Sequence, residues 1–265
     1  MPPLTPPPLD TIRCTVGILD PWTLPALAGA RSPLVGLSWG DQPVHLPDEK
    51  GNVLIAAGAA HGTTTVLRSL AAQFHALGAA VTVADLGAES HPWARELPGV
   101  RHLTRGGDIL DALFDLDSHS SKNPDTPDWD GRHVLVVDRA DDLAAALRER
   151  QRYLPIGTRH GEAEGLRALA RLLATTGRGA VQVLLGSSSA TVPAADVPLR
   201  RLFATRLLAG GTGLWGRAAP ETWAPPRAPT HPGRMHLVAA DGSITAVQTL
   251  HLTSEQARAA AAGPC

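Results

Sequence analysis

The chain has 265 residues, of which 43% are hydrophobic, and its formal net charge is −1 at pH 7. This composition excludes a disordered protein and suffices for one large α/β domain or two small ones. Because the net charge is close to zero, no global field attracts a polyanion, and a nucleic acid would need a local basic patch. Cys14 and Cys265 form neither a metal-binding spacing nor a disulfide framework, which indicates a reduced, cytoplasmic setting. Since no window approaches about eighteen uninterrupted apolar residues, we expect no membrane segment of its own.

The first elements lie before the first strongly apolar run. Residues 1–9 are rich in proline, which removes N–H donors and fixes φ, so they predict an extended tail. Residues 14–30 predict a short strand and a helical turn that prolines interrupt. Residues 34–46 alternate around a Gly-Asp pair, which predicts a β-hairpin that leads to the next strand.

Residues 52–65, NVLIAAGAAHGTTT, pass from an apolar strand through a glycine loop into an amphipathic helix. This order is typical of a phosphate-binding loop, because N–H groups of a tight loop and of a helix N-terminus point at one anion. The pattern Gly, four residues, Gly, Lys, Ser/Thr is met only in part. Gly62 and Thr64 match it, but Ala57 stands at the first glycine and Thr63 at the lysine. The alternative interpretation is a helix-starting turn with a threonine cap.

Beyond the loop, apolar strands alternate with amphipathic helices, which predicts parallel crossover units. Helical spacing of apolar residues predicts helices at 65–77, 91–97, 108–116, 139–152, 162–176 and 254–261. Strands are predicted at 79–84, 133–138, 180–185 and 204–209, with a hairpin from 234–238 and 244–250. Ser254 is the predicted cap of the last helix. The polar, turn-rich residues 117–131 predict an exposed loop.

Ligands of an α/β sheet bind at the carboxyl ends of its strands. The strand ends that we expect to meet at one edge are Ala57, Asp85, Asp138 and Leu185. Asp138 suits a carboxylate that holds Mg²⁺ through water while Thr64 contributes a hydroxyl, and the alternative role for Asp138 is to cap the following helix. The next residue, Arg139, cannot accept a proton from attacking water, so a catalytic base is missing at this position.

Further segments with family-like order and spacing are HPWARELPGVRHL at 91–103, HVLVVDRADDL at 133–143, LARLLATTGRGAVQVLLGSSSAT at 169–191, LRRLFATRLLAG at 199–210 and HPGRMHLV at 231–238. With these and its loop, the chain resembles the FtsK/SpoIIIE-type translocase domain of actinobacterial plasmid-transfer and mobile-element proteins. The resemblance implies a RecA-like P-loop NTPase fold, in which helices cover both faces of a mostly parallel sheet. It also implies a proline-rich extension at 1–32 and one domain at 33–265.

The resemblance also assigns roles to individual residues. The expected nucleotide-binding residues are Gly58, His61, Gly62, Thr63, Thr64 and Thr65. Thr64 and Asp138 would hold Mg²⁺ once a nucleotide is bound. Thr63 replaces the family's lysine, Arg139 its usual glutamate, and Ser188 its usual glutamine, which senses the γ-phosphate. Arg206 matches a basic residue of the family at a subunit or nucleotide edge. For His61, the alternative to a phosphate contact is a solvent-facing loop position.

These departures lower the expected activity more than the expected affinity. A lysine on the β- and γ-phosphates contributes roughly 1.5 to 3 kcal/mol, so its loss weakens binding by about one to two decades. Losing one donor that stabilises a transition state costs about a hundredfold to a thousandfold in rate. We therefore expect weak or absent binding of ATP and Mg²⁺, and little hydrolysis.

Three functions follow from this interpretation. The first is a catalytically impaired nucleotide-binding or structural and regulatory partner of a DNA-transfer motor, in a homo- or hetero-oligomer with FtsK-like subunits. The second is an active ATP-dependent translocase of double-stranded DNA, in which Arg139 or a partner supplies the missing charges. The third is a nucleotide-free scaffold of a secretion or phage-related assembly. The basic stretch Arg148, Arg150 and Arg152 is open to two interpretations, a DNA contact or a solvated helix face.

Overall fold

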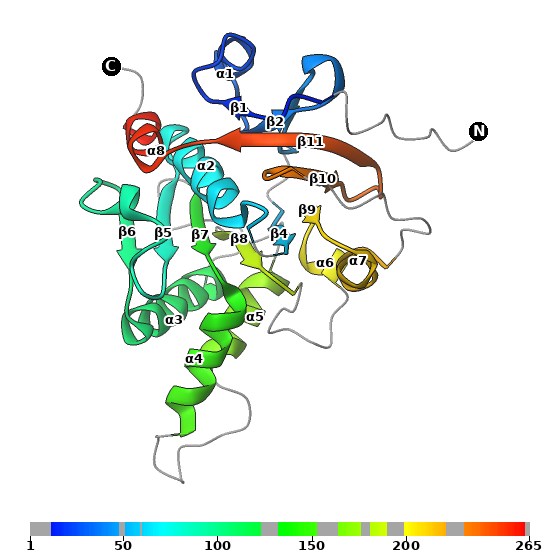
Figure 1. Ribbon diagram of the computed structural model, residues 1–265. Coiled ribbons are helices and arrows are strands. Elements are labelled where there is room, and N and C mark those ends of the chain that lie inside the picture. Colours follow the sequence, from blue (N-terminus) through cyan, green and yellow to red (C-terminus); the bar gives the residue numbers. More distant parts are fainter. Residues whose placement is uncertain are drawn as a thin grey trace.

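The computed structural model describes residues 12–47, 51–58, 60–122, 132–152, 164–175, 181–189, 199–220 and 231–262. In this part of the chain a single sheet of eleven strands runs through the whole molecule (Figure 1). The strand order is β3-β2-β11-β10-β9-β4-β8-β7-β5-β6, and β1 pairs separately with β11. Among the described residues, no helix has the length and apolarity that crossing a membrane requires.

One half of the sheet is parallel. Its strands are β9 (Thr205–Ala209), β4 (Val53–Ala57), β8 (Val181–Ser187), β7 (His133–Val137), β5 (Ala80–Ala84) and β6 (Val100–Leu103). All neighbours in this series pair in parallel. Strands β4, β7, β8 and β9 are buried along their whole length, as expected of strands with helices on both faces. Their carboxyl ends therefore point to the same edge of the sheet.

The other half is antiparallel. It consists of β10 (Arg234–Val238), β11 (Ile244–His251), β2 (Leu34–Leu37) and β3 (Pro43–His45). A glycine is required at position 36 of β2, because a Cβ there would meet the carbonyl oxygen of Gln248 at 2.0 Å. β1 (Val16–Gly17) adds to β11, with Val16 opposite Leu250. The described part of residues 1–32 thus pairs with the sheet, and a domain boundary at residue 33 stays a prediction.

Helices cover both faces of the sheet, as the fold prediction requires (Figure 1). Because side chains alternate along a strand, Val53 and Ile55 of β4 pack into one apolar core while Leu54 and Ala56 pack into the other. Helices α2 (Thr63–Ala76) and α8 (Ser254–Ala261) cover the first core. The second core takes side chains from α3 (Gly106–Lys122), α4 (Ala140–Arg152), α5 (Glu164–Ala174), α6 (Leu199–Leu202) and α7 (Thr212–Ala218).

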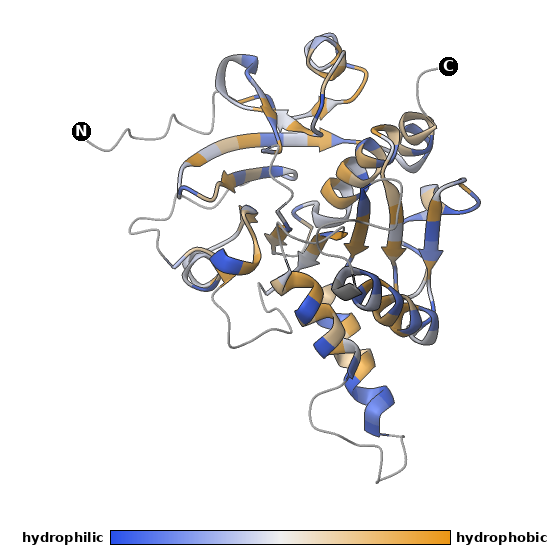
Figure 2. Ribbon diagram, turned by 180° about the vertical axis from the view of Figure 1, so that it is seen from behind, coloured by the Kyte–Doolittle hydropathy of each residue, from blue (hydrophilic) through white to orange (hydrophobic). Residues whose placement is uncertain are grey.

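The remaining helical elements are short. They are α1 (Leu24–Leu27) and the 3₁₀ turns η2 (Trp39–Asp41) and η3 (Pro92–Ala94). Figure 2 shows that the lower end of α4 in that view is hydrophilic. The arginines near this end lie on an exposed helix surface, and Arg152 pairs with Glu149 at 2.9 Å. This geometry agrees with a solvated helix face.

Three of the predicted elements are wrong in part. Residues 117–122 continue α3, so the predicted exposed loop at 117–131 does not begin at 117, and residues 123–131 lie outside the described residues. The predicted helix at 91–97 is only the turn η3, because Glu96 adopts a left-handed φ of 57° that ends a helix. Helix α8 is capped by Thr253 rather than Ser254. The Thr253 side chain accepts from the Gln256 N–H at 3.2 Å, which forms a capping box.

Strand β6 and helices α6 and α7 were not predicted. β6 is a short edge strand whose residues are only partly buried, so it lacks the continuous apolar run by which the other parallel strands are found. Helices α6 and α7 span only four and seven residues, too short for a helical period to stand out. The remaining strands and the hairpin of β10 and β11 confirm the predictions, with small shifts at their ends.

Candidate nucleotide site

The site is built around the junction of β4 and α2. The Gly58 N–H donates to the carbonyl of Ala209 at 3.0 Å, which ties the first residue of the loop to the end of β9. Ala60 and Gly62 have left-handed φ values of 62° and 94°, so the chain reverses sharply before Thr63 opens the helix. In the described chain no side chain caps α2 at Gly62. Its first N–H groups and the helix dipole are therefore directed at an anion-binding position.

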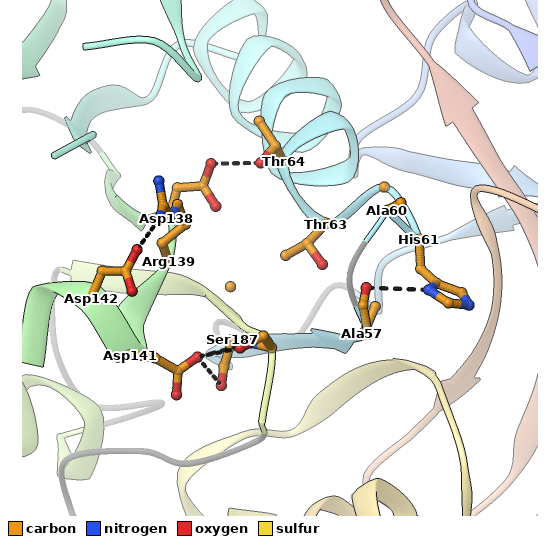
Figure 3. A pocket seen from close by; sticks show the side chains of 14 residues that line it. Ala57, Ala60, His61, Thr63, Thr64, Asp138, Arg139, Asp141, Asp142 and Ser187 are labelled. Carbon is orange, nitrogen blue, oxygen red and sulfur yellow. Dashed lines mark hydrogen bonds and ion pairs between the residues drawn. The ribbon is translucent and has the colours of Figure 1, made fainter. Parts of the chain in front are cut away.

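A cavity of about 520 Å³ lies in front of this loop (Figure 3). Its walls come from the loop between Ala57 and Thr64, from residues 138–142 after β7, and from residues 186–188 at the end of β8. These segments are far apart in the sequence and meet because β4, β8 and β7 are adjacent parallel strands. The prediction that the strand ends converge is confirmed for Ala57 and Asp138. Asp85 does not line the cavity, since its carboxylate accepts hydrogen bonds from the backbone of His91 at 3.0 Å and from His102 at 3.1 Å.

Thr64 and Asp138 are in direct contact. The Thr64 hydroxyl donates to Oδ2 of Asp138 at 2.8 Å, so the hydroxyl and the carboxylate lie side by side (Figure 3). The imidazole of His91, which is fully buried, contacts the same oxygen through Nε2 at 3.1 Å. Trp93 Nε1 contacts Nδ1 of His91 at 3.1 Å. Because the indole N–H can only donate, Nδ1 must accept, and the hydrogen on Nε2 is directed at Asp138.

These contacts control the charge of Asp138. Burial by itself raises the pKa of this carboxyl, but hydrogen bonds from His91, from Thr64 and from the backbone N–H of Arg139 outweigh burial. The pKa of Asp138 therefore lies below its ordinary value. A buried carboxylate that is ionised at neutral pH and lies beside a hydroxyl is a pair of hard oxygen ligands, which suits Mg²⁺.

A second carboxylate, Asp141, faces the cavity from the first turn of α4. Its Oδ2 accepts from the Ser187 hydroxyl at 3.0 Å, the Ser188 N–H at 2.9 Å and the Ser188 hydroxyl at 3.1 Å, and its Oδ1 accepts from the Ser189 hydroxyl at 2.6 Å. Burial raises the pKa of Asp141, but these donors outweigh burial and lower it. Ser188 lines the cavity, and its N–H and hydroxyl both donate to Asp141; its predicted place at the γ-phosphate sensor position stays a prediction.

Arg139 and Asp142 form a pair at the mouth of the cavity. The guanidinium of Arg139 bonds to the Asp142 carboxylate one helical turn further on, and both side chains are largely exposed. Arg139 itself has a left-handed φ of 55°, so the backbone turns sharply between β7 and α4 at this position. The cation at the position of the missing base is thus engaged by an acid of its own chain.

His61 and Thr63 take different positions in the loop. Nδ1 of His61 donates to the carbonyl of Gly58 at 3.2 Å, and in Figure 3 the ring lies on the side of the site away from Asp138. Thr63 lies against β8. A Cβ on Gly186 would meet Cγ2 of Thr63 at 2.8 Å, so the threonine methyl packs closely on a glycine backbone. Both residues line the cavity, and their predicted contact with a nucleotide stays a prediction.

The structure does not bring all of the predicted residues together. Thr65 is outside the cavity, because a rotation of about 100° per helical residue turns it away from the side that Thr63 and Thr64 present. Arg206 is 1% exposed and donates to the carbonyl of Ala218 at 3.1 Å, under α7. It lies near the start of β9, whereas the cavity is at the carboxyl end. Arg206 therefore does not line this cavity, and its predicted role at a subunit or nucleotide edge stays a prediction.

Sequence reasoning missed several groups of the site, namely His91, Asp141 and Asp142. The signals were present in the quoted segments, since Asp141 and Asp142 follow Asp138 in HVLVVDRADDL and His91 opens HPWARELPGVRHL. His91 and Asp138 are 47 residues apart in the sequence, and no sequence pattern indicates that they are in contact. Within the described residues, no group of His, Cys, Asp or Glu forms a metal cage on its own.

A strand, a tight loop and a helix N-terminus at the carboxyl edge of a parallel sheet define a P-loop NTPase fold. Family models and curated proteins yield no match to the sequence. Solved structures do match. The pCW3 conjugation coupling protein TcpA, in its monomer form with ATPγS, has a TM-score of 0.71 at 13% identity, over 93% of this chain and 72% of that chain.

Two secretion proteins are also similar. EccC of Thermomonospora curvata (ATPases 2 and 3), in complex with a signal sequence peptide, has a TM-score of 0.68 at 15% identity, over 91% of this chain and 44% of that one. EssC of Geobacillus thermodenitrificans (ATPases 2 and 3) has a TM-score of 0.63 at 13% identity, over 98% and 51%. This chain thus spans about half of those proteins. At these identities the likeness shows the fold, which is that of the FtsK/SpoIIIE-type ATPases.

Proposed function

We propose that this chain is a nucleotide-binding subunit with impaired hydrolysis, which acts as a structural or regulatory partner of a DNA-transfer motor. The observation that carries the proposal is the composition of the cavity wall. The loop, its helix N-terminus and the contact of Thr64 with Asp138 are in place, whereas Thr63 stands where a phosphate-binding lysine belongs. The site therefore keeps the groups that hold a nucleotide and lacks a cation that stabilises charge during phosphoryl transfer.

The other cation at the site does not replace the lysine. Among the described lining residues Arg139 is the sole arginine or lysine, and its guanidinium pairs with Asp142. Arginine also cannot take a proton from water, so this position supplies no general base. Asp141 is held by serine donors and has a lowered pKa, which makes it a weak base. Nucleotide binding without efficient turnover is the consequence.

Mg²⁺ would be held together with the nucleotide. Thr64 and Asp138 supply oxygen ligands, and phosphate oxygens and water would complete the coordination that the protein alone does not provide. The metal would screen the phosphate charges in the absence of the lysine. Its affinity is therefore coupled to that of the nucleotide.

Two structural neighbours support the choice of partner. TcpA is a conjugation coupling protein, and EccC is a type VII secretion ATPase. We infer that the chain assembles with FtsK-like subunits in the cytoplasm, as a homo- or hetero-oligomer on double-stranded DNA. A domain of this fold with an intact loop fits beside active subunits and stabilises their assembly without adding turnover of its own.

Calorimetric titration with ATP and Mg²⁺, followed by a phosphate-release assay with and without duplex DNA, tests the proposal. We expect saturable binding, with a dissociation constant about one to two decades above that of a lysine-containing site, and little or no phosphate release. DNA-stimulated turnover would show an active translocase instead. Absence of any nucleotide binding would show a nucleotide-free scaffold.

A further inference from the structure

The cavity has two chemically different walls. The wall formed by the loop and the start of α2 presents N–H groups and the hydroxyl of Thr63, which can donate to an anion, while the Thr64 hydroxyl donates to Asp138. The facing wall carries Asp141, which projects from α4 beside Ser187 (Figure 3). A phosphate chain that starts on the loop and extends across the cavity would approach this carboxylate.

Asp141 is fixed in this position. Serine donors hold both of its oxygens, at distances from 2.6 Å for Ser189 to 3.1 Å for Ser188. Its lowered pKa keeps it ionised at neutral pH. A carboxylate with so many donors does not turn away without breaking several hydrogen bonds.

Within the described residues, no arginine or lysine donates to Asp141. Its donors are neutral hydroxyl and N–H groups of Ser187, Ser188 and Ser189. Arg139 is engaged with Asp142, and Asp138 is bonded to Thr64 and His91. Two acids of the cavity, Asp138 and Asp141, thus have no arginine or lysine partner among the described lining residues. Because phosphate groups are also negative, these carboxylates would weaken the binding of a phosphate that faces them.

We infer that Asp141 makes this cavity selective for a nucleoside diphosphate over a nucleoside triphosphate, because its carboxylate faces the position that a third phosphate would take. The inference rests on the proposed nucleotide site and names its ligand class. The diphosphate uses the donors of the loop and stops short of Asp141. The triphosphate adds negative charge next to a carboxylate whose donors among the described residues are all neutral serine groups.

Titration calorimetry with AMP, ADP and ATP in excess Mg²⁺ tests the inference on the wild-type chain. We expect ADP to bind about tenfold more tightly than ATP, which corresponds to about 1.4 kcal/mol. In Asp141→Asn, whose amide oxygen still accepts from the serines, ATP affinity should rise about tenfold while ADP affinity changes less than about twofold. Asp111→Asn removes the same charge from an exposed position on α3 and should keep the wild-type ratio.

Ser189→Ala distinguishes the effect of the negative charge of Asp141 from the effect of its hydrogen bond to Ser189. It removes the 2.6 Å bond to Oδ1 of Asp141 and leaves the carboxylate in place, so we expect it to keep the preference for ADP. The inference is overturned if the wild-type chain binds ATP as tightly as ADP, if Asp141→Asn keeps the wild-type ratio, or if Ser189→Ala abolishes it. Nucleotide binding with one of these results leaves the proposed function intact. Absence of binding by both nucleotides, in wild type and in Asp141→Asn, overturns the proposed function and the inference together.

Discussion

Nε2 of His91 lies 3.1 Å from Oδ2 of Asp138, and both side chains are buried. Since the same oxygen accepts from Thr64 at 2.8 Å, the carboxylate is held in one orientation from two sides. Trp93 in turn fixes the imidazole at 3.1 Å. His91 therefore acts through Asp138 and is a positioning residue of the site.

Replacing His91 by alanine should change the pKa of Asp138 while the fold is retained. The carboxylate loses a hydrogen bond that lowers its pKa, so we expect this pKa to rise. A group with a depressed folded-state pKa contributes stability above its unfolded value, and this stability is lost as the pH falls through the folded value. In His91→Ala the unfolding free energy should therefore decrease less between neutral and acid pH than it does in wild type. At neutral pH it should be lower than in wild type by about 1 to 3 kcal/mol. Urea unfolding over a pH series measures both effects.

His102→Ala is the matched control for His91→Ala. His102 contacts Asp85 at 3.1 Å and lies outside the cavity. Only the His91 variant should weaken binding of Mg²⁺ and nucleotide, about threefold to tenfold for a misplaced ligand group. Equal losses in the two variants would assign His91 a purely structural role. His91→Gln, which retains a donor, should recover part of the affinity.

The double variant Thr63→Lys, Arg139→Glu tests whether the loop geometry is intact. Lysine would place an ammonium in the cavity and glutamate would provide a base at the start of α4, so phosphate release should rise at least about tenfold above wild type. Thr63→Gln with Arg139→Glu has a similar side-chain length without the cation and should stay near the wild-type rate. If the double variant binds nucleotide and still shows no turnover, more than the charges has been lost.

Buried His236 should make the protein less stable in mild acid. Burial lowers its pKa from 6.5 to about 4, so the unfolded chain takes up a proton at a higher pH than the folded chain does. The unfolding free energy should accordingly be highest above pH 6.5 and fall by about 1.4 kcal/mol per pH unit down to about pH 4. His236→Phe keeps a ring against Trp215 and should remove the part of this pH dependence that His236 causes.

Denaturant titrations at about pH 7 and about pH 5 measure the difference for His236. Wild type should lose about 2 kcal/mol more than His236→Phe between these two pH values. The exposed His251 provides a control, since His251→Phe should keep the wild-type dependence. Burial also lowers the pKa of His133 to about 4, so His133 causes a further pH dependence of the unfolding free energy, which remains in His236→Phe. An unchanged slope in His236→Phe would contradict the assignment.

The cap of α8 gives a direct test of the structure against the sequence pattern. Thr253 accepts from the Gln256 N–H, while Ser254 is already inside the helix. Thr253→Ala should lower the unfolding free energy by about 1 kcal/mol, or the Tm by about 2 to 4 °C. Ser254→Ala should change stability by only a few tenths of a kcal/mol. Thermal unfolding followed by circular dichroism distinguishes the two, and a larger loss for Ser254 would move the cap back to that residue.

The fold was predictable because its signals are local. Continuous apolar runs such as residues 133–137 identify strands buried on both faces, and the glycine loop before Thr63 identifies the anion-binding turn. Elements without such signals were missed or misplaced. The edge strand β6 is half-buried, and the end of α3 at Lys122 carries polar residues that are also common in turns.

By itself, the sequence determined that a glycine loop of the P-loop type, with Thr63 at the lysine position, follows a buried strand, since strand, loop and helix are contiguous in the chain. Only the tertiary structure decided what surrounds that loop. His91 reaches Asp138 across 47 residues, and Asp141 meets Ser187 across 46, because the order of β8, β7 and β5 in the sheet brings their ends together. Arg206 does not reach the cavity because it lies near the start of β9, whereas the cavity lies at the carboxyl ends of the strands.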